Sequence, residues 1–538
     1  PDLNLRGEIA VSNPLRLIWL AVNKGTGGAK PDFFMDMIML FRQLRGESQQ
    51  ASYSREHVNA WMERYPSGLD PRIIQVREEN KQRIIKILMR QIETEEGKST
   101  RYYFEPHLNH AQKLEKMERW WEDYRFHLRF AVRSPALLNE MLDHSLDPDT
   151  MKILEEAFEA GIPFFVNPYY LSLLHVRVPY FAVGADLAIR YYVLYSKQLV
   201  EEFGNIVAWE KEDQVKPGLP NAAGWLLPEG HNLHRRYPEV AILIPDTMGR
   251  ACGGLCSSCQ RMYDFQGGRL NFNLDKLAPG EQWEEKLKRL MTYFEEDAQL
   301  RDILITGGDG LMSSDKSLMH LLDEISGMAL RKKKKNESLP EGEKLAEIVR
   351  VRIGTRLPVY LPQRITLNLV KILKEFKEKA AAAGIRQFII QTHFESPMEV
   401  SPLSAMSIQR LIASGWTVIN QQVFTAAASR RGHTAKLRQV LNDIGVLPYY
   451  TFTVKGYMEN NAGFAPTARV VQEQLEEKVL GNINEQYDDT IKKVPDESTL
   501  MVENIEALRR YASLPFLATD RNVLNLPGVG KSLTFRVI

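Results

Sequence analysis

Cysteine is scarce in this chain: three occur among 538 residues, and all three lie between positions 252 and 259. That count excludes a secreted scaffold held by disulfides and favours a reducing, cytoplasmic location. No apolar run approaches the roughly 20 residues that cross a bilayer, and no targeting segment is visible. The net charge of +1 gives no reason to expect a nucleic acid or an acidic membrane as a partner.

The three cysteines have the spacing C-x3-C-x2-C, as Cys252, Cys256 and Cys259. Thiolates are the preferred ligands of iron–sulfur clusters, and three on one loop can hold three corners of a cubane. The fourth iron is then open to a small molecule. A structural zinc site closes with four ligands, and this loop has no fourth Cys or nearby His. The sequence therefore predicts a [4Fe-4S] cluster, against the alternatives of a catalytic or a buried thiol.

The chain has two parts that differ in sequence pattern. Residues 1 to about 230 are mostly helical in pattern, for example from Ala185 to Phe203, and from about 239 short Val/Ile-rich runs alternate with amphipathic helices. Strands buried on both faces and separated by helices indicate parallel βαβ units. We predict an α/β fold, a partial (β/α)6 barrel with a large helical N-terminal region. Its six strands are expected at 239–245, 302–309, 348–356, 386–394, 417–424 and 447–454.

Chemistry in such barrels gathers at the carboxyl ends of the strands. The cysteine loop follows the first predicted strand, and Gly307-Gly308-Asp309 follows the second. Two glycines let a backbone approach a ligand closely, although a tight turn would also use them. His393 and Gln421 lie at the fourth and fifth strands, and Lys455 follows the sixth.

Two lysine-containing stretches have competing interpretations. Lys531 lies in a Gly-Lys-Ser run, but a phosphate loop would need Gly where Asn525 stands. A lysine on a Gly-rich loop can instead form a Schiff base with pyridoxal phosphate (PLP), unless it is a surface residue. The basic run at 330–336 could bind nucleic acid, but a solvated loop insertion is the preferred interpretation.

Together these motifs resemble the lysine 2,3-aminomutase family of radical S-adenosylmethionine (SAM), PLP-dependent enzymes. The resemblance runs from about Trp120 to the C-terminus, and residues 1 to about 110 have no counterpart. It is carried by WEDYRFHLR (121–129), NPYYLSLL (167–174), HRRYP (234–238), the cysteine loop, ITGGD (305–309), RIGTRLPVYLPQRIT (352–366), QTHF (391–394), NQ (420–421), PYY (448–450) and PGVGK (527–531).

The resemblance implies a [4Fe-4S] cluster, SAM and PLP as cofactors, and transfer of an α-amino group to the β-carbon. It assigns Lys531 to PLP attachment and Arg261 to the substrate α-carboxylate, which a planar guanidinium suits. The other residues that match by position are Arg236 and Tyr237 beside PLP, and Gly307, Gly308, Asp309, His393 and Gln421 beside SAM. It further implies an electron donor such as flavodoxin or ferredoxin, and a homo-oligomer.

Two positions bear on the substrate. Lysine-acting members place aspartates around the substrate ammonium, and Lys455 and Asn525 match those positions here. A cation repels an ammonium but holds a carboxylate well, and the glutamate 2,3-aminomutases are similar at both places. L-Glutamate to β-glutamate is thus the favoured reaction. The alternatives are lysine or another amino acid, a surface role for Lys455 with Asn525 as a turn former, or a non-catalytic iron–sulfur protein with a partner-binding N-terminal region.

Four regions are expected along the chain. They are a helical N-terminal extension at 1–110, a helical region before the barrel at 111–230, the radical SAM partial barrel at 231–460, and a C-terminal segment with the PLP-lysine loop at 461–538.

Overall fold

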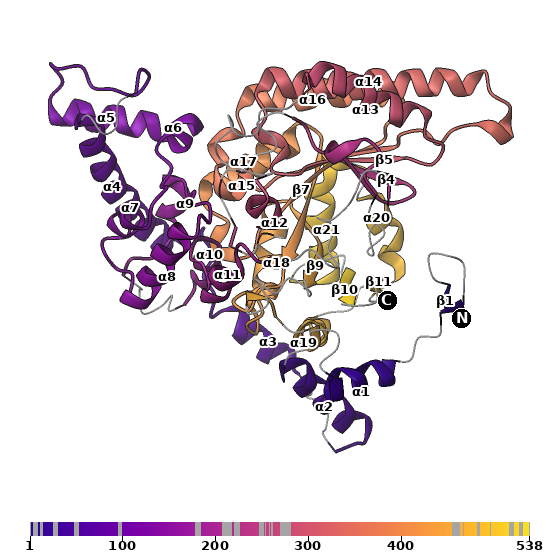
Figure 1. Cartoon of the computed structure of the whole chain (residues 1–538), viewed down its shortest axis with the longest axis horizontal. Coiled ribbons are helices and arrows are strands. Elements are labelled where there is room, and N and C mark those ends of the chain that lie inside the picture. The colour runs from indigo at the N-terminus through magenta and orange to yellow at the C-terminus, as the bar shows by residue number, and fades with distance from the viewer. Residues whose placement is uncertain are drawn as a thin grey trace.

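One large sheet lies at the centre of the computed structural model (Figure 1). The structure describes every residue except 1, 4–8, 11–13, 25–30, 48–52, 95–98, 178–183, 207–217, 220–225, 247–251, 253, 255, 258, 260–261, 269–280, 454–462, 466, 481–484, 495, 516–520, 527–530 and 537–538. Within these described parts the sheet has nine strands, in the order β11-β10-β9-β8-β7-β6-β5-β4-β3. They are β3 (Leu233–Tyr237), β4 (Val240–Leu243), β5 (Asp302–Ile305), β6 (Arg350–Gly354), β7 (Gln387–Thr392), β8 (Thr417–Val423), β9 (Leu447–Thr453), β10 (Arg521–Leu526) and β11 (Lys531–Arg536).

The six strands predicted from the sequence are present as β4 to β9, and each pairs in parallel with the next. Their apolar side chains, such as Ile303, Val351 and Ile390, are fully buried, as expected for strands covered on both faces. Three strands of this sheet were not predicted, and neither was the separate antiparallel pair of β1 (Asp2–Leu3) and β2 (Ile9–Ala10). β3 pairs antiparallel with β4, β10 pairs parallel with β9, and β11 returns antiparallel along β10.

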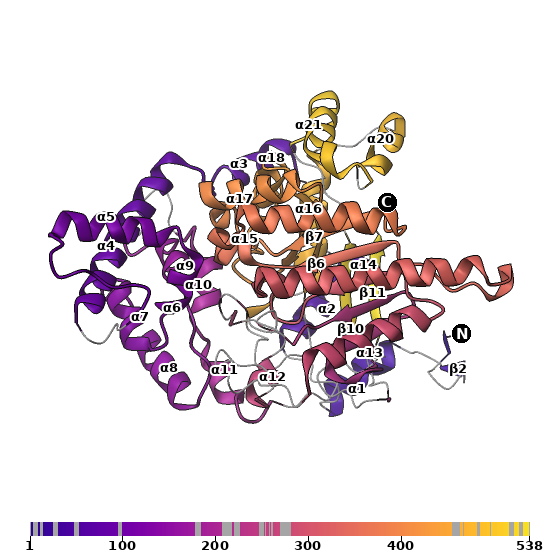
Figure 2. The same ribbon diagram turned by 90° about the horizontal axis from the view of Figure 1, so that it is seen from above.

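The crossover helices form a layer beside the strands (Figures 1 and 2), in which α13 packs on α14, α14 on α16 and α16 on α17. Along the chain, helices lie between successive parallel strands, so the sheet is an ordered series of βα units. The α/β class is confirmed, and the curvature of a partial barrel stays a prediction. The helices between β4 and β10 include α13 (Trp283–Glu296), α14 (Asp315–Glu337), α16 (Leu367–Ala382), α17 (Pro402–Ala413), α18 (His433–Asp443), α19 (Thr467–Lys478), α20 (Asp488–Lys493) and α21 (Met501–Ala512).

Helices fill the chain before the sheet, as predicted. They are α1 (Pro14–Lys24), α2 (Pro31–Leu44), α3 (Arg55–Met62), α4 (Pro71–Glu93), α5 (His110–Trp121), α6 (Tyr124–Arg129), α7 (Pro135–Met141), α8 (Pro148–Glu159), α9 (Pro168–Ser172), α10 (Leu187–Val193) and α11 (Lys197–Glu202). The single helix expected from Ala185 to Phe203 is wrong, because Leu194 is extended and Ser196 starts a new helix by capping Leu199 N–H. No helix in the described ranges is both long and apolar enough to cross a membrane.

The basic run at 330–336 is also not a solvated loop. It forms the last turns of α14, and Lys332 within it is fully buried. The ammonium of Lys332 donates to the carbonyl oxygens of Phe294 and Asp297, at 2.8 and 2.7 Å. Those carbonyls end helix α13 and have no partner inside it, so Lys332 caps α13 from the neighbouring helix.

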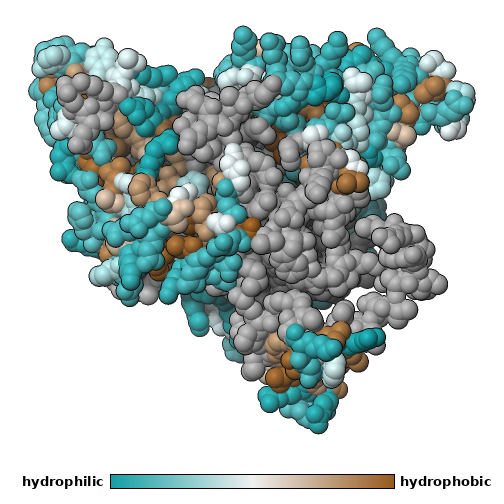
Figure 3. Space-filling model, in the orientation of Figure 1, coloured by the Kyte–Doolittle hydropathy of each residue, from teal (hydrophilic) through white to brown (hydrophobic). Residues whose placement is uncertain are grey.

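Helices α1 and α2 expose apolar side chains at the lower end of the view in Figure 3. Leu15, Trp19 and Val22 on α1 are each more than half exposed, as is Leu44 on α2. A surface helix normally turns such a stripe towards a core. This surface is therefore a feature of the N-terminal region that the rest of the described chain leaves uncovered.

Candidate functional site

The carboxyl edge of the parallel strands gathers most of the predicted site. The cysteine loop leaves this edge after β4, Gly307-Gly308-Asp309 leaves it after β5, and His393 directly follows β7. The three cysteines are thiols rather than disulfides, and all are partly buried. Cys259 N–H donates to the Cys256 carbonyl at 2.9 Å, which closes a tight turn between two of the sulfurs.

Cys256 contacts two side chains from the connection after β6. Its Sγ lies 3.1 Å from Nη1 of Arg356 and 3.1 Å from the hydroxyl of Tyr360, which ends the short helix α15 (Leu357–Tyr360). The ring of Tyr360 also lies against Gly254, where a Cβ would come within 3.0 Å of it. A side chain at 254 would push against this ring, so glycine favours close packing of the cysteine loop on Tyr360.

Arg356 is buried, and its guanidinium is held on every side. Nε donates to the His393 carbonyl at 3.1 Å, Nη1 to the Tyr360 hydroxyl at 2.8 Å, and Nη2 to Glu399 Oε1 at 2.7 Å. The guanidinium carbon lies 3.8 Å from the ring centre of Tyr192 and 4.4 Å from that of Tyr360. Burial opposes its charge, but Tyr360 and Glu399 raise the pKa of Arg356 well above the ordinary value, so the group stays protonated.

Glu399 balances this charge. It is fully buried, and besides Arg356 it accepts from the Tyr170 hydroxyl at 2.9 Å and from Glu395 N–H at 2.6 Å. Burial and the neighbouring Glu399 raise the pKa of Glu395 to about 8. Glu395 is therefore mostly protonated at neutral pH, so the buried cluster carries one ion pair rather than an extra negative charge.

Asp309 anchors the Gly-Gly turn. Its carboxylate accepts from Arg356 N–H at 2.7 Å and from Leu311 N–H at 3.1 Å, and burial raises its pKa to about 6. Gly307 has φ +116°, and a Cβ there would lie 2.5 Å from the Ile244 side chain. Only glycine fits this position, so the turn after β5 is packed directly against the chain that leaves β4.

His393 and Gln421 lie next to each other. Burial and the charge of Arg356 lower the pKa of His393 to about 4, although a hydrogen bond to the Gln421 main chain opposes this. The imidazole is therefore neutral at pH 7. Asn420, the residue before Gln421, accepts from Phe394 N–H at 2.7 Å and donates to the Phe394 carbonyl at 3.0 Å. This pair of bonds fixes the backbone of Phe394, directly after His393.

Asn525 and Lys531 are placed only by the strand register. Asn525 lies near the end of β10, and Lys531 starts β11 opposite Leu526. Because β10 is parallel to β9, both backbones lie at the carboxyl edge, as the cysteine loop does. Tyr237 pairs with Val240 at the amino end of β4, and the guanidinium of Arg236 lies 5.7 Å from the Tyr237 ring. Arg261 and Lys455 lie outside the described residues.

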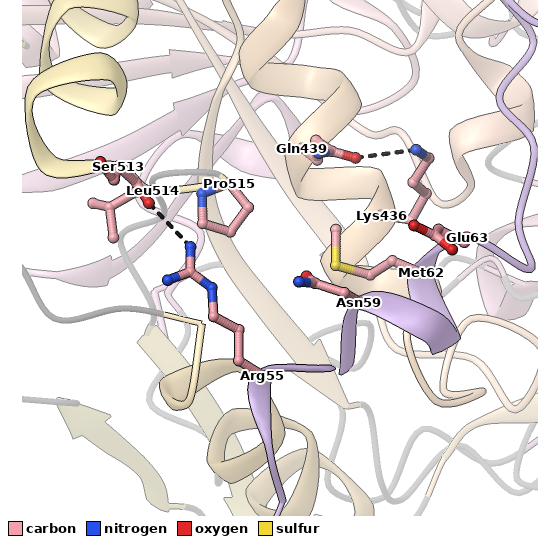
Figure 4. Close-up of a pocket in the computed structure, with 9 residues that line it drawn as sticks. All are labelled: Arg55, Asn59, Met62, Glu63, Lys436, Gln439, Ser513, Leu514 and Pro515. Atoms are coloured by element: carbon pink, nitrogen blue, oxygen red, sulfur yellow. Dashed lines mark hydrogen bonds between the residues drawn. The ribbon is translucent and has the colours of Figure 1, made fainter. Parts of the chain in front are cut away.

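Sequence reasoning assigned no role to Arg356, Glu399 or the tyrosines around them. The available signal was an arginine and a tyrosine within the otherwise apolar segment that follows β6. A different feature is the cavity of about 460 Å³ between α3, α18 and the end of α21 (Figure 4). None of the predicted site residues lines it. Its lining is Arg55, Asn59, Met62, Glu63, Lys436, Gln439, Ser513, Leu514 and Pro515.

The cysteine loop has a donor set that suits a cubane cluster. Among the residues that the structure describes, no three His, Cys, Asp or Glu side chains surround a single point as ligands of one metal ion. A cubane does not require this, because each thiolate binds a different iron. Three partly buried thiols on one loop, with a guanidinium beside Cys256, fit an anionic cluster rather than a single ion.

The fold and this site define an α/β protein with a three-cysteine loop and a Gly-Gly turn at the carboxyl edge of a parallel sheet. No protein-family model matches the chain. Its homologues are KamA-family proteins and 2,3-aminomutases. It is 31% identical over 445 residues, 82% of this chain and 61% of the relative, to an uncharacterized KamA family protein of Methanocaldococcus jannaschii.

Two further relatives have named activities. The chain is 26% identical over 333 residues to the L-lysine 2,3-aminomutase of Methanococcus maripaludis, covering 62% of this chain and 64% of that protein. It is 26% identical over 349 residues to the glutamate 2,3-aminomutase of Clostridioides difficile, covering 64% and 67%. The chain thus spans less than two thirds of the length of the first two relatives. Both activity names denote isomerases.

Proposed function

We propose that this protein is an isomerase, a radical SAM, PLP-dependent 2,3-aminomutase. The observation that carries the proposal is the sheet register, in which Lys531 begins β11 at the same edge from which the cysteine loop leaves β4. Six strands, β5 to β10, separate β4 from β11 in the sheet order, so the curvature of a partial barrel would bring a cluster with SAM and a lysine-bound PLP to one site. The four-region division of the chain and the partial-barrel curvature belong to this proposal.

The chain's own residues hold and orient the cofactors. Cys252, Cys256 and Cys259 would ligate the cluster, and Lys531 would attach PLP. The resemblance also assigns Arg236 and Tyr237 to PLP, but Tyr237 pairs at the amino end of β4, the edge opposite to that of Lys531. Gly307, Gly308, Asp309, His393 and Gln421 would contact SAM. When bound, these groups supply an electron, a hydrogen-abstracting radical and a π-system that delocalises spin. The protein supplies position and excludes water. The buried ion pair of Arg356 and Glu399 lies next to the cysteine loop, through the contact of Arg356 with Cys256.

An acidic amino acid, most simply L-glutamate, is the substrate we propose. Arg261 would pair with the α-carboxylate, and Lys455 with Asn525 would bind the side-chain carboxylate. The relatives include both lysine and glutamate 2,3-aminomutases, so the substrate rests on these two residues. A reductant such as flavodoxin or ferredoxin and a homo-oligomeric assembly complete the proposal.

The test is turnover by the anaerobically purified full chain with SAM, PLP and dithionite. We expect β-glutamate from L-glutamate, and no β-lysine from L-lysine. Turnover of lysine alone would contradict the acidic substrate and keep the aminomutase. A protein that binds neither PLP nor SAM would instead favour a non-catalytic iron–sulfur protein that binds a partner.

A further inference from the structure

We propose that Arg356 is a positioning residue for the cysteine loop, which it holds through Cys256 and to which it lends a permanent positive charge. The inference rests on the proposed function, because it concerns the cluster that the loop would carry. The inference goes beyond the proposed function because it assigns a role to a residue outside the cysteine, SAM, PLP and substrate positions.

The first argument is geometric. Nη1 of Arg356 lies 3.1 Å from Cys256 Sγ, within the range of a hydrogen bond to sulfur. Tyr192 and Tyr360 enclose the guanidinium by their rings, and Nε and Nη2 are fixed by His393 and Glu399. A side chain held by this many contacts has little freedom left, so its bond to the sulfur is fixed by the fold and not by chance rotation.

The second argument is electrostatic. A cubane with three thiolates is anionic, and it gains one more negative charge on reduction. Hydrogen bonds to its sulfurs and nearby charge set the reduction potential. In a buried site the attraction is strong because little water screens it. Arg356 therefore favours the reduced form and raises the potential, whereas Glu399, 2.7 Å from the guanidinium, partly offsets that charge.

The test is an anaerobic redox titration of the reconstituted full chain, followed by the electron paramagnetic resonance of the reduced cluster. Arg356→Gln should lower the midpoint potential relative to wild type, and Arg356→Lys should lower it less, since it keeps the charge but loses the fork of donors. Glu399→Gln should shift the potential the opposite way. If Arg356 and Glu399 merely stabilised the fold, their Gln variants would not shift the midpoint potential in opposite directions.

Arg364→Gln is the matched control. Arg364 is 1% exposed and lies in the same β6–α16 connection, but it bonds Ser313 O and Asp315, both at 2.8 Å, and no cysteine. The midpoint potential of the cluster in Arg364→Gln should equal that in wild type. If wild type takes up the cluster and Arg356→Gln has the same midpoint potential, this inference is overturned and the proposed function stays intact. If Arg356→Gln does not fold, the absence of an upward shift in Glu399→Gln overturns it. A wild type that takes up no iron would overturn both.

Discussion

The guanidinium of Arg77 in helix α4 donates a hydrogen bond of 2.5 Å to the main-chain oxygen of Met398, 321 residues further along the chain. Nearby, Gly68 N–H donates to the Pro397 carbonyl at 3.0 Å. The turn held in this way carries Glu399, which orients Arg356 next to Cys256. Residues before about 110, which have no counterpart in the sequence resemblance, thus support the turn beneath the cysteine loop.

Gly68→Ala should destabilise the protein. A Cβ at this position would lie 2.5 Å from the Val400 carbonyl oxygen, 2.7 Å from that of Met398 and 2.5 Å from Arg77 Nη1. Two of these neighbours are backbone, so the turn must move, at a cost of about 1–3 kcal/mol. The midpoint of denaturant unfolding measures it. Gly342→Ala, which has no atom within 4 Å of its added carbon, is the control, and equal midpoints for the two variants would refute this contact.

Glu395→Gln should change how stability depends on pH. The pKa of Glu395 is about 8 in the folded protein, raised by burial from 4.5. Between these values the folded form binds more protons than the unfolded form, so this group lowers stability as the pH rises. Each unit of pKa difference is worth about 1.4 kcal/mol. Glutamine stays neutral and keeps an oxygen for Val423 N–H, now 2.7 Å from Glu395, so its advantage should grow from pH 5 to pH 8.5.

Unfolding free energies of both proteins at several pH values check this. Glu378→Gln, on the exposed side of α16, should follow the wild-type curve. Parallel curves for wild type and Glu395→Gln would mean that Glu395 is ionised in the folded state over the whole range.

Lys531→Ala should abolish the visible absorbance of bound PLP and leave the iron content unchanged. The Schiff base needs this amine, whereas the cluster needs only the thiolates. Cys256→Ala should do the reverse and lose iron while it keeps PLP. Absorbance spectra and iron analysis on the same samples measure both. Lys371→Ala, exposed on α16, is the control for a lysine with no cofactor role; normal PLP absorbance in Lys531→Ala would remove Lys531 from the site.

Replacing Lys455 and Asn525 together by Asp should move the preference from glutamate towards lysine. Like charges facing each other cost several kcal/mol, so the ratio of the two kcat/KM values should change by roughly 100-fold or more. Competition assays with both amino acids give this ratio directly. A double variant that loses all activity but keeps PLP and iron would leave these residues essential without setting specificity, and an unchanged ratio would place them outside the substrate pocket.

Much of the fold could be predicted because its signals are local. The six parallel strands are short apolar runs such as DILI, and each is followed by an amphipathic helix. β3 was not predicted because its sequence, LHRRY, is polar at the positions where a buried strand would be apolar. The burial of Lys332 was not predicted for another reason. A lysine run usually marks a solvated face, and only the nearby end of α13 explains why this lysine is buried.

The candidate site divides in the same way. Spacing alone identified the cysteines, and the Gly-Gly turn could be expected from its place after a strand. Arg356 and Glu399 could not be paired from sequence, since 43 residues separate them and nothing local joins an arginine to a glutamate. Such pairs depend on which strands become neighbours, which is a property of the whole sheet.

The bond between Arg77 and Met398 also sets an order of events during synthesis. Ribosomes add roughly 5–20 residues per second, so Arg77 emerges roughly 15–60 s before its partner, which lies 321 residues later. During that interval the turn at residues 397–398, to which Arg77 and Gly68 bond, does not yet exist. The packing of α4 on α5, α7 and α9 can form in that interval, whereas its docking to the turn that carries Glu399 has to follow the synthesis of β7.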